Sequence, residues 1–453
     1  MKAKLSAVTL ALLPVLAAGT AQASQAEYAD DSIIVVYKEN VSKVEKTRAR
    51  MSVGARISDA NRDEIDDHLK TVLNGRIAKL SLRGKSVKDA IEILSRNPAI
   101  KVVEPNYLYR AAVEPNDPDF GDLWGLNNTG QSGGTADVDI DAPEAWNITT
   151  GDSDIVIGVI DSGVDYEHED LAANMWVNPG EVPGDGIDND GNGYIDDVHG
   201  YNFDQDNANL TLVPVGRGGF NPRAQHGFMC AAIICGTGAK GRKYEFGIAP
   251  EGTWTGVIAS GRLEAAIEWA VEQGADTYSM SFSIPRLGEY RSHWRKVMEQ
   301  GSLCGVFFVS GAGNFSESEP VPVQMRVPED IPEVVFAAAG VQRDFSRTPF
   351  SSQGPVKWET EHYREGLVQK LEVCAFNMGL PFLRRDGSVM NAGLNGNSFA
   401  GPMFCGAIAL MLSADPDLLP WDLKEVITAT ATDVAAPGVD AQTGHGLINC
   451  YRA

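Results

Sequence analysis

Ser398 occupies a position in the sequence where a hydroxyl group could act as a nucleophile. It lies in Asn395-Gly-Asn-Ser-Phe-Ala-Gly-Pro402, directly before the apolar run Met403–Leu412, which predicts a buried helix. At a helix N-terminus, unpaired N–H groups and the helix dipole favour developing negative charge, as acyl transfer requires. Pro402 fits this placement because proline is tolerated near a helix start. Taken alone, the stretch fits equally well a serine that caps a core helix.

Three further polar residues could complete a hydrolytic site with Ser398. They are Asp161, which follows an apolar stretch, His226, which precedes a helical pattern, and Asn314, which follows another apolar stretch. The histidine would accept and return the serine proton while the aspartate holds the imidazole. The amide of Asn314 and the N–H of Ser398 would bind the oxyanion. Each residue alone has a plainer interpretation, as a cap, a surface or core histidine, or a turn.

The elements that must position these residues alternate between strand and helix patterns. Continuous apolar or β-branched runs predict strands, and a stripe of apolar residues between them predicts a helix. This alternation predicts an α/β fold with a mostly parallel sheet and helices on both faces, in which ligands gather at the carboxyl ends of the strands. Asp161, Ser281 and Asn314 all lie at or just beyond strand ends. The predicted strands are 155–160, 276–282 and 306–309, and the helix is 263–271.

A smaller α+β unit is predicted before this sheet, over residues 31 to 110. Strand patterns at 32–37 and 100–103 flank a helical pattern at 87–94. The polar, proline-containing stretch 113–118 predicts an exposed linker that a protease could cut. Residues 1 to 23 have the basic start, apolar centre and small terminal residues of a secretory signal. We therefore predict a signal peptide at 1–23, a leader at 24–117 and a main domain at 118–453.

Charge is distributed unevenly along the 453 residues. Residues 1 to 110 carry 18 basic and 13 acidic side chains, whereas the remainder carries 20 and 48, so the two parts should attract each other. The net charge of −23 disfavours nucleic acid as a partner. No apolar run after the signal is long enough to span a membrane, which predicts a product exported to the periplasm or the extracellular medium. Six cysteines are too few for a disulfide scaffold and are expected to be mostly small core residues.

The order Asp, His, Ser and the local motifs resemble the subtilisin family, the subtilases. The resemblance continues in the leader, which is similar to the inhibitory propeptide of these enzymes. The matching strings are Ile160-Asp-Ser-Gly-Val-Asp165 with His168-Glu-Asp-Leu171, Gln225-His-Gly-Phe-Met-Cys230, Gly311-Ala-Gly-Asn314, Gly396-Asn-Ser-Phe-Ala-Gly-Pro402, Trp124-Gly-Leu-Asn-Asn-Thr-Gly130, Ile140-Asp-Ala-Pro-Glu-Ala-Trp146, and Val103-Glu-Pro-Asn-Tyr107.

This resemblance implies a secreted serine endopeptidase that works through an acyl-enzyme and is made as a self-processing zymogen. Its partners would be protein or peptide substrates and its own propeptide. It also implies a pocket for the residue before the cut, with walls formed by Ser281, Phe282 and Ser283 on one side and by Ala312 and Gly313 on the other.

The chain departs from the family pattern at four positions. Phe228 and Met229 replace a threonine and a second histidine, Asn397 replaces a threonine, and Gly401 stands where Thr or Ala is commoner. These changes leave open a second hypothesis, a catalytically inactive subtilase-fold protein that binds a partner or serves at a surface. A cysteine hydrolase that uses Cys230 with His226 is a weaker third hypothesis, because no oxyanion site is evident beside Cys230.

An acidic segment predicts a calcium site. Asp188-Asn-Asp-Gly-Asn-Gly-Tyr-Ile-Asp-Asp197 has the D-x-D-x-N-G start of an EF-hand loop but lacks the glutamate at its twelfth position. Hard oxygen ligands select calcium, and residues 111 to 216 contain no lysine or arginine. A solvated Asp/Gly turn is the alternative. The predicted ligands are Asp188, Asp190, Asn192, the carbonyl of Tyr194, and Asp197.

Overall fold

The computed structural model describes most of the chain after the first 27 residues, in two compact units, Met1–Arg110 and Ala111–Ala453. The predicted signal at 1–23 lies outside the described residues, as does the predicted linker except for Pro115. The boundary between leader and main domain at residues 117 and 118 stays a prediction. The described ranges are 28–38, 40–57, 77–107, 115, 120–131, 134–211, 225–237, 247–258, 262–285, 287–383 and 389–453.

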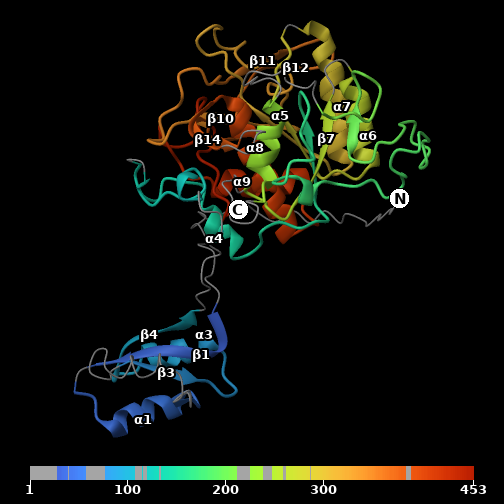
Figure 1. Ribbon diagram of the computed structural model, residues 1–453. Helices are drawn as coiled ribbons and strands as arrows, with labels where there is room; N and C mark the ends of the chain where they lie inside the picture. Colours follow the sequence, from blue (N-terminus) through green and yellow to red (C-terminus); the bar gives the residue numbers. More distant parts are fainter. Residues whose placement is uncertain are drawn as a thin grey trace. The chain divides into compact units, whose positions relative to one another are not determined.

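In its described residues, the first unit is a four-stranded antiparallel sheet with two helices, in the strand order β2-β3-β1-β4 (Figure 1). Helix α3 begins after Ser86, whose hydroxyl accepts a hydrogen bond from the Asp89 N–H at 3.1 Å. It buries Val87, Ala90 and Leu94 in a core separate from that of the second unit. The predicted α+β leader is thereby confirmed. The elements are β1 Tyr28–Tyr37, α1 Lys43–Ser52, β2 Arg56–Ile57, β3 Ile77–Ser81, α3 Val87–Ser95 and β4 Ile100–Tyr107.

The second unit is built on a seven-stranded sheet in which every described pair is parallel, in the order β13-β10-β9-β8-β5-β7-β6. The central strands are buried on both faces, as their continuous apolar sequences require. The predicted mostly parallel α/β sheet is confirmed. Its strands are β5 Val156–Ile160, β6 Gly200–Asn202, β7 Thr253–Ile258, β8 Thr277–Met280, β9 Phe307–Gly311, β10 Val335–Val341 and β13 Val373–Phe376.

Helices cover both faces of this sheet. Successive residues of a strand point to opposite faces. On β8, the Thr277 hydroxyl lies 3.6 Å from Cys405 Sγ of α8, whereas the Tyr278 ring stacks on Phe308, which packs against Gly301 of α7. Figure 1 shows α5 beside α8, and α6 beside α7. The helices are α4 Ala142–Trp146, α5 His226–Cys235, α6 Leu263–Glu272, α7 Arg291–Leu303, α8 Asn397–Ala414 and α9 Pro420–Thr430.

Short elements complete the second unit. Two antiparallel hairpins, β11 with β12 and β14 with β15, precede α8 in the chain. The hairpin strands are β11 Val356–Glu359, β12 Arg364–Val368, β14 Met378–Leu383 and β15 Val389–Asn395, and the 3-10 turns are η2 Phe120–Asp122, η4 Ala172–Asn174 and η7 Gly288–Tyr290.

Helix α8 is the central helix of the second unit. Among the described residues it is the one helix long and apolar enough to cross a membrane, but 83% of it is buried inside the fold, which identifies it as a core helix. It lies close to the sheet because Gly401 has no side chain. A Cβ at Gly401 would lie 2.8 Å from the Gly311 backbone nitrogen of β9. All six cysteines are free, and five of them are buried.

Candidate active site

Asp161 and His226 form a hydrogen-bonded pair at the carboxyl end of β5. Asp161 directly follows the strand, and His226 is the first residue of α5. The Nδ1 atom of His226 lies 2.9 Å from Asp161 Oδ1 and 2.8 Å from Oδ2. Gly227 permits this approach, because a Cβ there would lie 2.4 Å from the Gly163 carbonyl oxygen and 2.9 Å from Asp161 Cβ. An Nδ1–H that donates to the carboxylate leaves Nε2 free to accept a proton.

The environment of His226 favours its charged form. Burial alone would lower the pKa of His226, but the charge of Asp161 and its hydrogen bonds outweigh burial and hold the pKa well above 6.5. The side chain of His226 remains 25% exposed, so a substrate can reach it, whereas that of Asp161 is only 5% exposed. The pair is therefore suited to stabilising an imidazolium ion that forms during proton transfer.

Ser398 is the second residue of α8, and its backbone carbonyl is held from outside the helix. In a regular helix this carbonyl would accept the N–H of residue 402, but Pro402 has no N–H. The carbonyl oxygen instead accepts hydrogen bonds from the Ser281 hydroxyl at 2.9 Å and from the Cys230 thiol at 3.5 Å. Pro402 thus allows the start of α8 to be fastened to the end of β8 and to α5.

These contacts bring Ser398 to the same end of the sheet as His226. Cys230 Sγ lies 3.9 Å from His226 Nδ1, and the ring of Phe399 lies 5.6 Å from the imidazole, centroid to centroid. Ser398 itself is half-buried. The predicted nucleophile and the Asp161–His226 pair therefore lie together, although 172 residues separate Ser398 from His226.

Asn314 is oriented by the residue before Ser398. Its Oδ1 accepts a hydrogen bond from the Asn397 N–H at 2.8 Å, so its Nδ2 is the amide atom left to face solvent. The side chain is exposed, and Nδ2 lies 3.7 Å from the position of a Cβ built on Gly396, directly before α8. An N–H donor beside a helix start is the arrangement that can bind an oxyanion.

Asn397 was noted in the sequence only as a replacement, but the structure gives it a positioning role. Its side chain is fully buried and donates to the Gly313 carbonyl at 2.5 Å and to Ser351 Oγ at 3.0 Å. Its Oδ1 accepts from Asn377 Nδ2 at 2.6 Å. The Asn397 side chain therefore connects the start of α8 to the loop that carries Asn314, through Gly313, and to the segments that carry Ser351 and Asn377.

The two predicted pocket walls lie on either side of the start of α8. The Ser281 hydroxyl of one wall donates to the Ser398 carbonyl of α8. The Gly313 carbonyl of the other wall accepts from the Asn397 side chain of α8. Phe282 packs edge-on against Trp294, with ring centroids 6.5 Å apart, and Ala312 is fully buried. The Ser283 hydroxyl donates to Glu329 Oε1 at 2.7 Å. Sequence reasoning did not single out Glu329.

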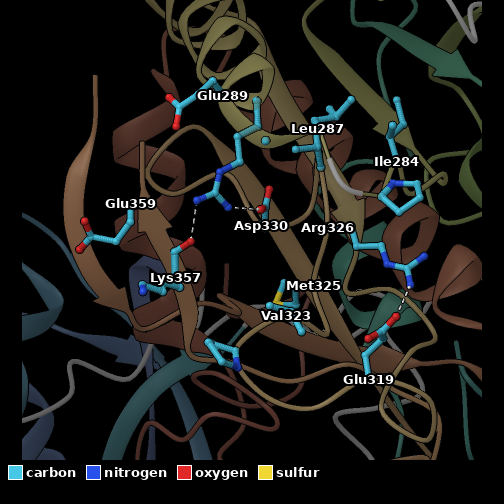
Figure 2. Close-up of a pocket in the computed structure, with 15 residues that line it drawn as sticks. Ile284, Leu287, Glu289, Glu319, Val323, Met325, Arg326, Asp330, Lys357 and Glu359 are labelled. Carbon is cyan, nitrogen blue, oxygen red and sulfur yellow. Dashed lines mark hydrogen bonds and ion pairs between the residues drawn. The ribbon is translucent and has the colours of Figure 1, made fainter. Parts of the chain in front are cut away.

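Beyond the first wall, the structure contains a cavity of about 380 Å³ (Figure 2). Ile284 and Val327, which are joined by an antiparallel bridge, contribute to its lining, together with Met325 and Asp330. Asp330 is 4% exposed and is paired with Arg291 at 3.4 Å. Glu329 and Asp330 are thus successive buried acids, of which the first contacts a pocket wall and the second lines the cavity.

The unusual residues after His226 point into the core. Phe228 is 1% exposed and contacts the ring of His168 edge-on, with centroids 4.9 Å apart, and Met229 is 2% exposed. Cys230 is fully buried, and burial raises the pKa of its thiol, which disfavours the reactive thiolate. This environment argues against Cys230 as a nucleophile.

The acidic loop forms an oxygen cluster whose members differ in part from those predicted. Carboxylate oxygens of Asp188, Asp190 and Glu181 lie within 4.8 Å of one another. Glu181 was not predicted, because it lies before the motif. Asp197 is fully buried and accepts hydrogen bonds from Trp269 Nε1 at 2.6 Å and from two asparagine amides.

Asp197 stays a predicted ligand. Its oxygens accept three hydrogen bonds, but the oxygens of Glu181 and Asp188 each accept three backbone N–H groups as well. Asn192 donates from Nδ2 to Asp190 and Asp197, and its Oδ1 accepts the Tyr194 N–H at 2.7 Å. The Tyr194 carbonyl remains a predicted ligand. Glu181, Asp188 and Asp190 fit a hard cation such as calcium, since all three offer oxygen atoms.

Comparison with known proteins agrees with this arrangement. The chain matches the subtilase family over residues 152–446 and the fervidolysin N-terminal prodomain over residues 16–106. It is 26% identical over 439 residues to the halolysin-like extracellular serine protease Nep of Natrialba magadii, covering 93% of this chain and 67% of that protein. It is also 26% identical over 442 residues to a thermophilic serine proteinase of Bacillus sp. strain AK1, covering 94% and 88%.

A solved structure is similar over both units. Fervidolysin from Fervidobacterium pennivorans, a keratinolytic enzyme related to subtilisin, aligns with a TM-score of 0.52 and 19% identity, covering 95% of this chain and 62% of that chain. At this identity the likeness concerns the fold, and the chain spans about three fifths of fervidolysin. Because the family match covers more than half of the sequence, this chain belongs to the subtilase family of serine proteases and carries a fervidolysin-like N-terminal prodomain.

Proposed function

We propose that the chain is a secreted serine endopeptidase that cleaves peptide bonds through Asp161, His226 and Ser398. The observation that carries the proposal is the double contact of His226 Nδ1 with the Asp161 carboxylate, beside the helix start that holds Ser398. This contact fixes the imidazole with Nε2 free. Ser398 Oγ attacks the carbonyl carbon, and His226 takes the hydroxyl proton and returns it to the leaving amine. Water then hydrolyses the acyl-enzyme by the same steps.

Asn314 Nδ2 and the Ser398 N–H stabilise the oxyanion in this mechanism. The hydrogen bond from the Asn397 N–H to Asn314 Oδ1 supports this role, because it engages the amide oxygen and leaves the amide nitrogen beside the start of α8 as a donor. Removing one such donor in a comparable site costs about 10²- to 10³-fold in kcat. We expect a loss of this size in Asn314→Ala, with little change in KM.

The raised pKa of His226 predicts the pH dependence of the reaction. Only neutral imidazole can act as general base, so kcat/KM should rise with pH through the pKa of His226, which lies well above 6.5. A pH profile on a small peptide substrate checks this expectation. Activity that is already maximal below pH 6.5 would contradict the assignment.

The first unit is proposed to be an inhibitory propeptide, and the chain to be made as a zymogen. The prodomain match and the opposite charges of the two units support this role. We propose that the leader is removed by self-cleavage near residues 110 to 118. Export is proposed from the signal pattern at 1–23, and the extracellular protease Nep is a relative.

Calcium is proposed to bind Glu181, Asp188 and Asp190, with Asn192, the Tyr194 carbonyl and Asp197 as further predicted ligands. When bound, it would supply positive charge that holds the acidic loop together and stabilises the folded state by mass action. The three residues bind the ion and orient the loop. They lie in a part of the chain without basic side chains that could neutralise them.

The test compares secreted wild-type protein with Ser398→Ala. We expect the wild type to begin near residues 111 to 118 and to hydrolyse peptides, and Ser398→Ala to begin near Ser24 and to be inactive. Cys230→Ala tests the cysteine-hydrolase alternative and should still be processed, since its thiol donates to the Ser398 carbonyl but takes no part in bond cleavage. A wild type that keeps its leader and cleaves no peptide would favour the inactive, subtilase-fold alternative instead.

A further inference from the structure

Glu329 is a buried carboxyl group that contacts both predicted walls of the substrate pocket. It is 0% exposed, and its Oε1 accepts the Ser283 hydroxyl at 2.7 Å from the first wall. On the second wall, a Cβ built on Gly313 would lie 2.8 Å from the same Oε1. The carboxyl group therefore lies where the two walls meet, behind the surface that would face a substrate side chain.

No cation of the fold neutralises Glu329 among the described residues. The nearby guanidinium of Arg326 is paired with Glu319 at 3.2 Å and lies over the Phe315 ring at 3.5 Å. Arg291 is paired with Asp330, and Figure 2 shows both ion pairs around the cavity. The second oxygen, Glu329 Oε2, has no hydrogen-bond partner in the described structure.

A lone buried carboxyl group is costly for a fold. Removing an ionised carboxylate from water without a partner costs several kcal/mol, so natural cores rarely keep one. Folding alone therefore gives no reason for Glu329, whereas a cationic ligand would. The ligand that enters a protease pocket is the side chain before the scissile bond.

Ser283 connects this carboxyl group to the pocket surface. Its hydroxyl has one proton, which it donates to Glu329, so the remaining lone pairs of its oxygen can only accept. Ser283 is half-buried, whereas Glu329 is 0% exposed, so the Ser283 oxygen is the more accessible of the two groups. An ammonium or guanidinium group can donate to this oxygen and at the same time lie close to the negative charge behind it. An apolar side chain gains neither interaction.

We propose that Glu329, acting through Ser283, makes the pocket for the residue before the cut select lysine or arginine. This inference rests on the proposed peptidase function and adds a substrate class to it. Glu329 and Ser283 are specificity-determining residues, and they take no part in bond cleavage.

The charged groups around Glu329 make the selection depend on pH. Burial raises the pKa of Glu329 to about 8, the Ser283 hydrogen bond lowers it in part, and the neighbouring Asp330 raises it further. Arg326 and Arg291 are held by their own partners, Glu319 and Asp330. The carboxyl group is thus largely neutral near pH 7 and ionises as the pH rises or as a cation arrives. The preference for lysine over an uncharged residue should grow between pH 7 and pH 9.

The experiment measures kcat/KM on two peptides that differ only in lysine or norleucine before the cut. Charge-assisted hydrogen bonds contribute about 1.5 to 3 kcal/mol, so mature wild type should prefer lysine by roughly 10- to 100-fold. In Glu329→Gln, which keeps the shape and removes the charge, this ratio should fall close to one. Ser283→Ala should lower the ratio as well and provides a second test if Glu329→Gln folds poorly. Glu317→Gln removes an exposed charge from the same loop and should keep the wild-type ratio.

Labelling by a fluorophosphonate, which reacts with an activated serine, distinguishes failure of the Glu329 assignment from failure of the peptidase function. A wild type that is labelled but prefers norleucine, or a lysine preference that survives in Glu329→Gln, would overturn the assignment of Glu329 alone. A wild type that is neither labelled nor active would overturn the peptidase function and this inference together.

Discussion

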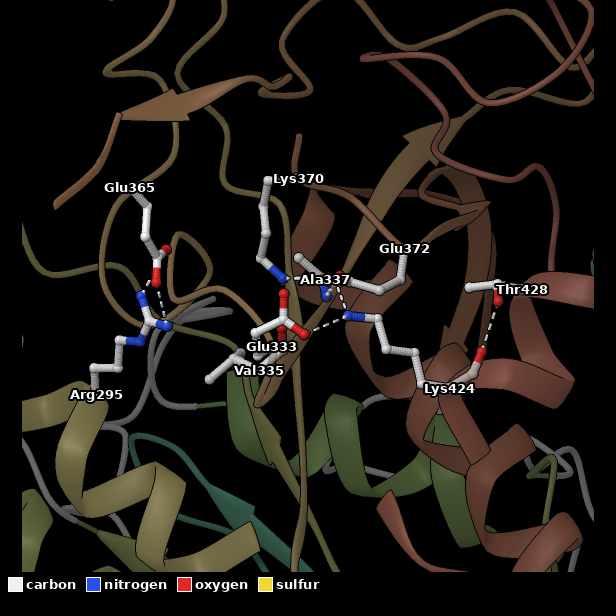
Figure 3. A network of polar contacts seen from close by, with 9 residues as sticks. All are labelled: Arg295, Glu333, Val335, Ala337, Glu365, Lys370, Glu372, Lys424 and Thr428. Carbon is white, nitrogen blue, oxygen red and sulfur yellow. Dashed lines mark hydrogen bonds and ion pairs between the residues drawn. The ribbon is translucent and has the colours of Figure 1, made fainter. Parts of the chain in front are cut away.

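Two buried glutamates in the second unit differ in how their charge is neutralised. Glu372 is bound through both oxygens by the Lys370 ammonium, at 2.9 and 2.8 Å, and also accepts the Ala337 N–H at 2.8 Å (Figure 3). Lys370 is 1% exposed and additionally donates to the Val335 carbonyl. Glu329 is also buried, but its partners are the Ser283 hydroxyl and backbone N–H groups, and no cation pairs with it among the described residues.

The difference separates a structural carboxylate from one available to a ligand. The Lys370–Glu372 pair connects the start of β10 to the segment before β13, and its charges cancel inside the fold. At Glu329 the compensating charge is missing from the fold and lies beside a predicted substrate pocket. Glu372 and Glu329 are both buried glutamates, so the presence or absence of a cationic partner is what distinguishes them.

The largest expected effect concerns the Lys370–Glu372 ion pair. Lys370→Met should leave Glu372 as an uncompensated buried charge and destabilise the protein by about 3 to 5 kcal/mol. Urea unfolding in the Ser398→Ala background, which prevents self-digestion, measures this loss. Lys424→Met is the control, because this more exposed ammonium lies 3.9 Å from Glu372 and should contribute less than about 1 kcal/mol. Equal losses in the two variants would show that Lys370 has no special role.

At Glu329 an effect of similar size is expected, but it appears only as the pH rises. The folded-state pKa of Glu329 is raised from 4.5 to about 8, so the folded protein holds a proton that the unfolded chain releases. Stability due to this proton is complete below pH 4.5 and is lost as the pH rises to about 8. Glu329→Gln should remove a fall on the order of 5 kcal/mol over this range, relative to wild type.

The fall caused by Asp330, whose pKa burial raises to about 7, should remain in Glu329→Gln. Unfolding free energies measured at several pH values give the comparison, with Glu317→Gln as the control for loss of a surface charge. If the unfolding free energies of wild type and Glu329→Gln changed in parallel with pH, the charge of Glu329 would already be neutralised within the fold. Glu329 would then not differ from Glu372.

The smallest expected effect concerns the carboxylates of the acidic loop, where the proposed partner is a metal ion. Free calcium at ten times its Kd should stabilise the fold by about 1.4 kcal/mol and raise the melting temperature by a few degrees. A chelator should reverse this shift. Asp188→Asn should abolish the response, whereas Asp185→Asn, in the same loop but outside the cluster, should keep it. A melting temperature that does not change with calcium would contradict the proposed site and favour a solvated turn.

The sequence predicted the sheet and its helices well because their patterns are local. Continuous apolar runs predicted β5 and β9 to within two residues, and β8 ends two residues earlier than expected. The helix after Ser398 was expected from an apolar run beginning at Met403, and it begins at Asn397. The sequence also placed Asp161, Asn314 and Ser281 at strand ends, where parallel strands bring distant residues together.

The buried polar contacts were not predictable in the same way. Ser283 and Glu329 are 46 residues apart, and nothing in Val327-Pro-Glu-Asp330 indicates that both acids face inward. Likewise Asn397 looked like a simple replacement until its partners Gly313 and Asn377 were seen. Such contacts depend on how loops that are distant in the sequence pack together. The local pattern of apolar residues does not predict this packing.

The most direct test of the proposed mechanism is to locate a fluorophosphonate adduct by mass spectrometry of the mature protein. We predict one adduct per chain, on the peptide that contains Ser398, and its absence from both Ser398→Ala and protein unfolded before labelling. An adduct on any other residue, or labelling that persists in Ser398→Ala, would contradict the assignment of Ser398 as the nucleophile.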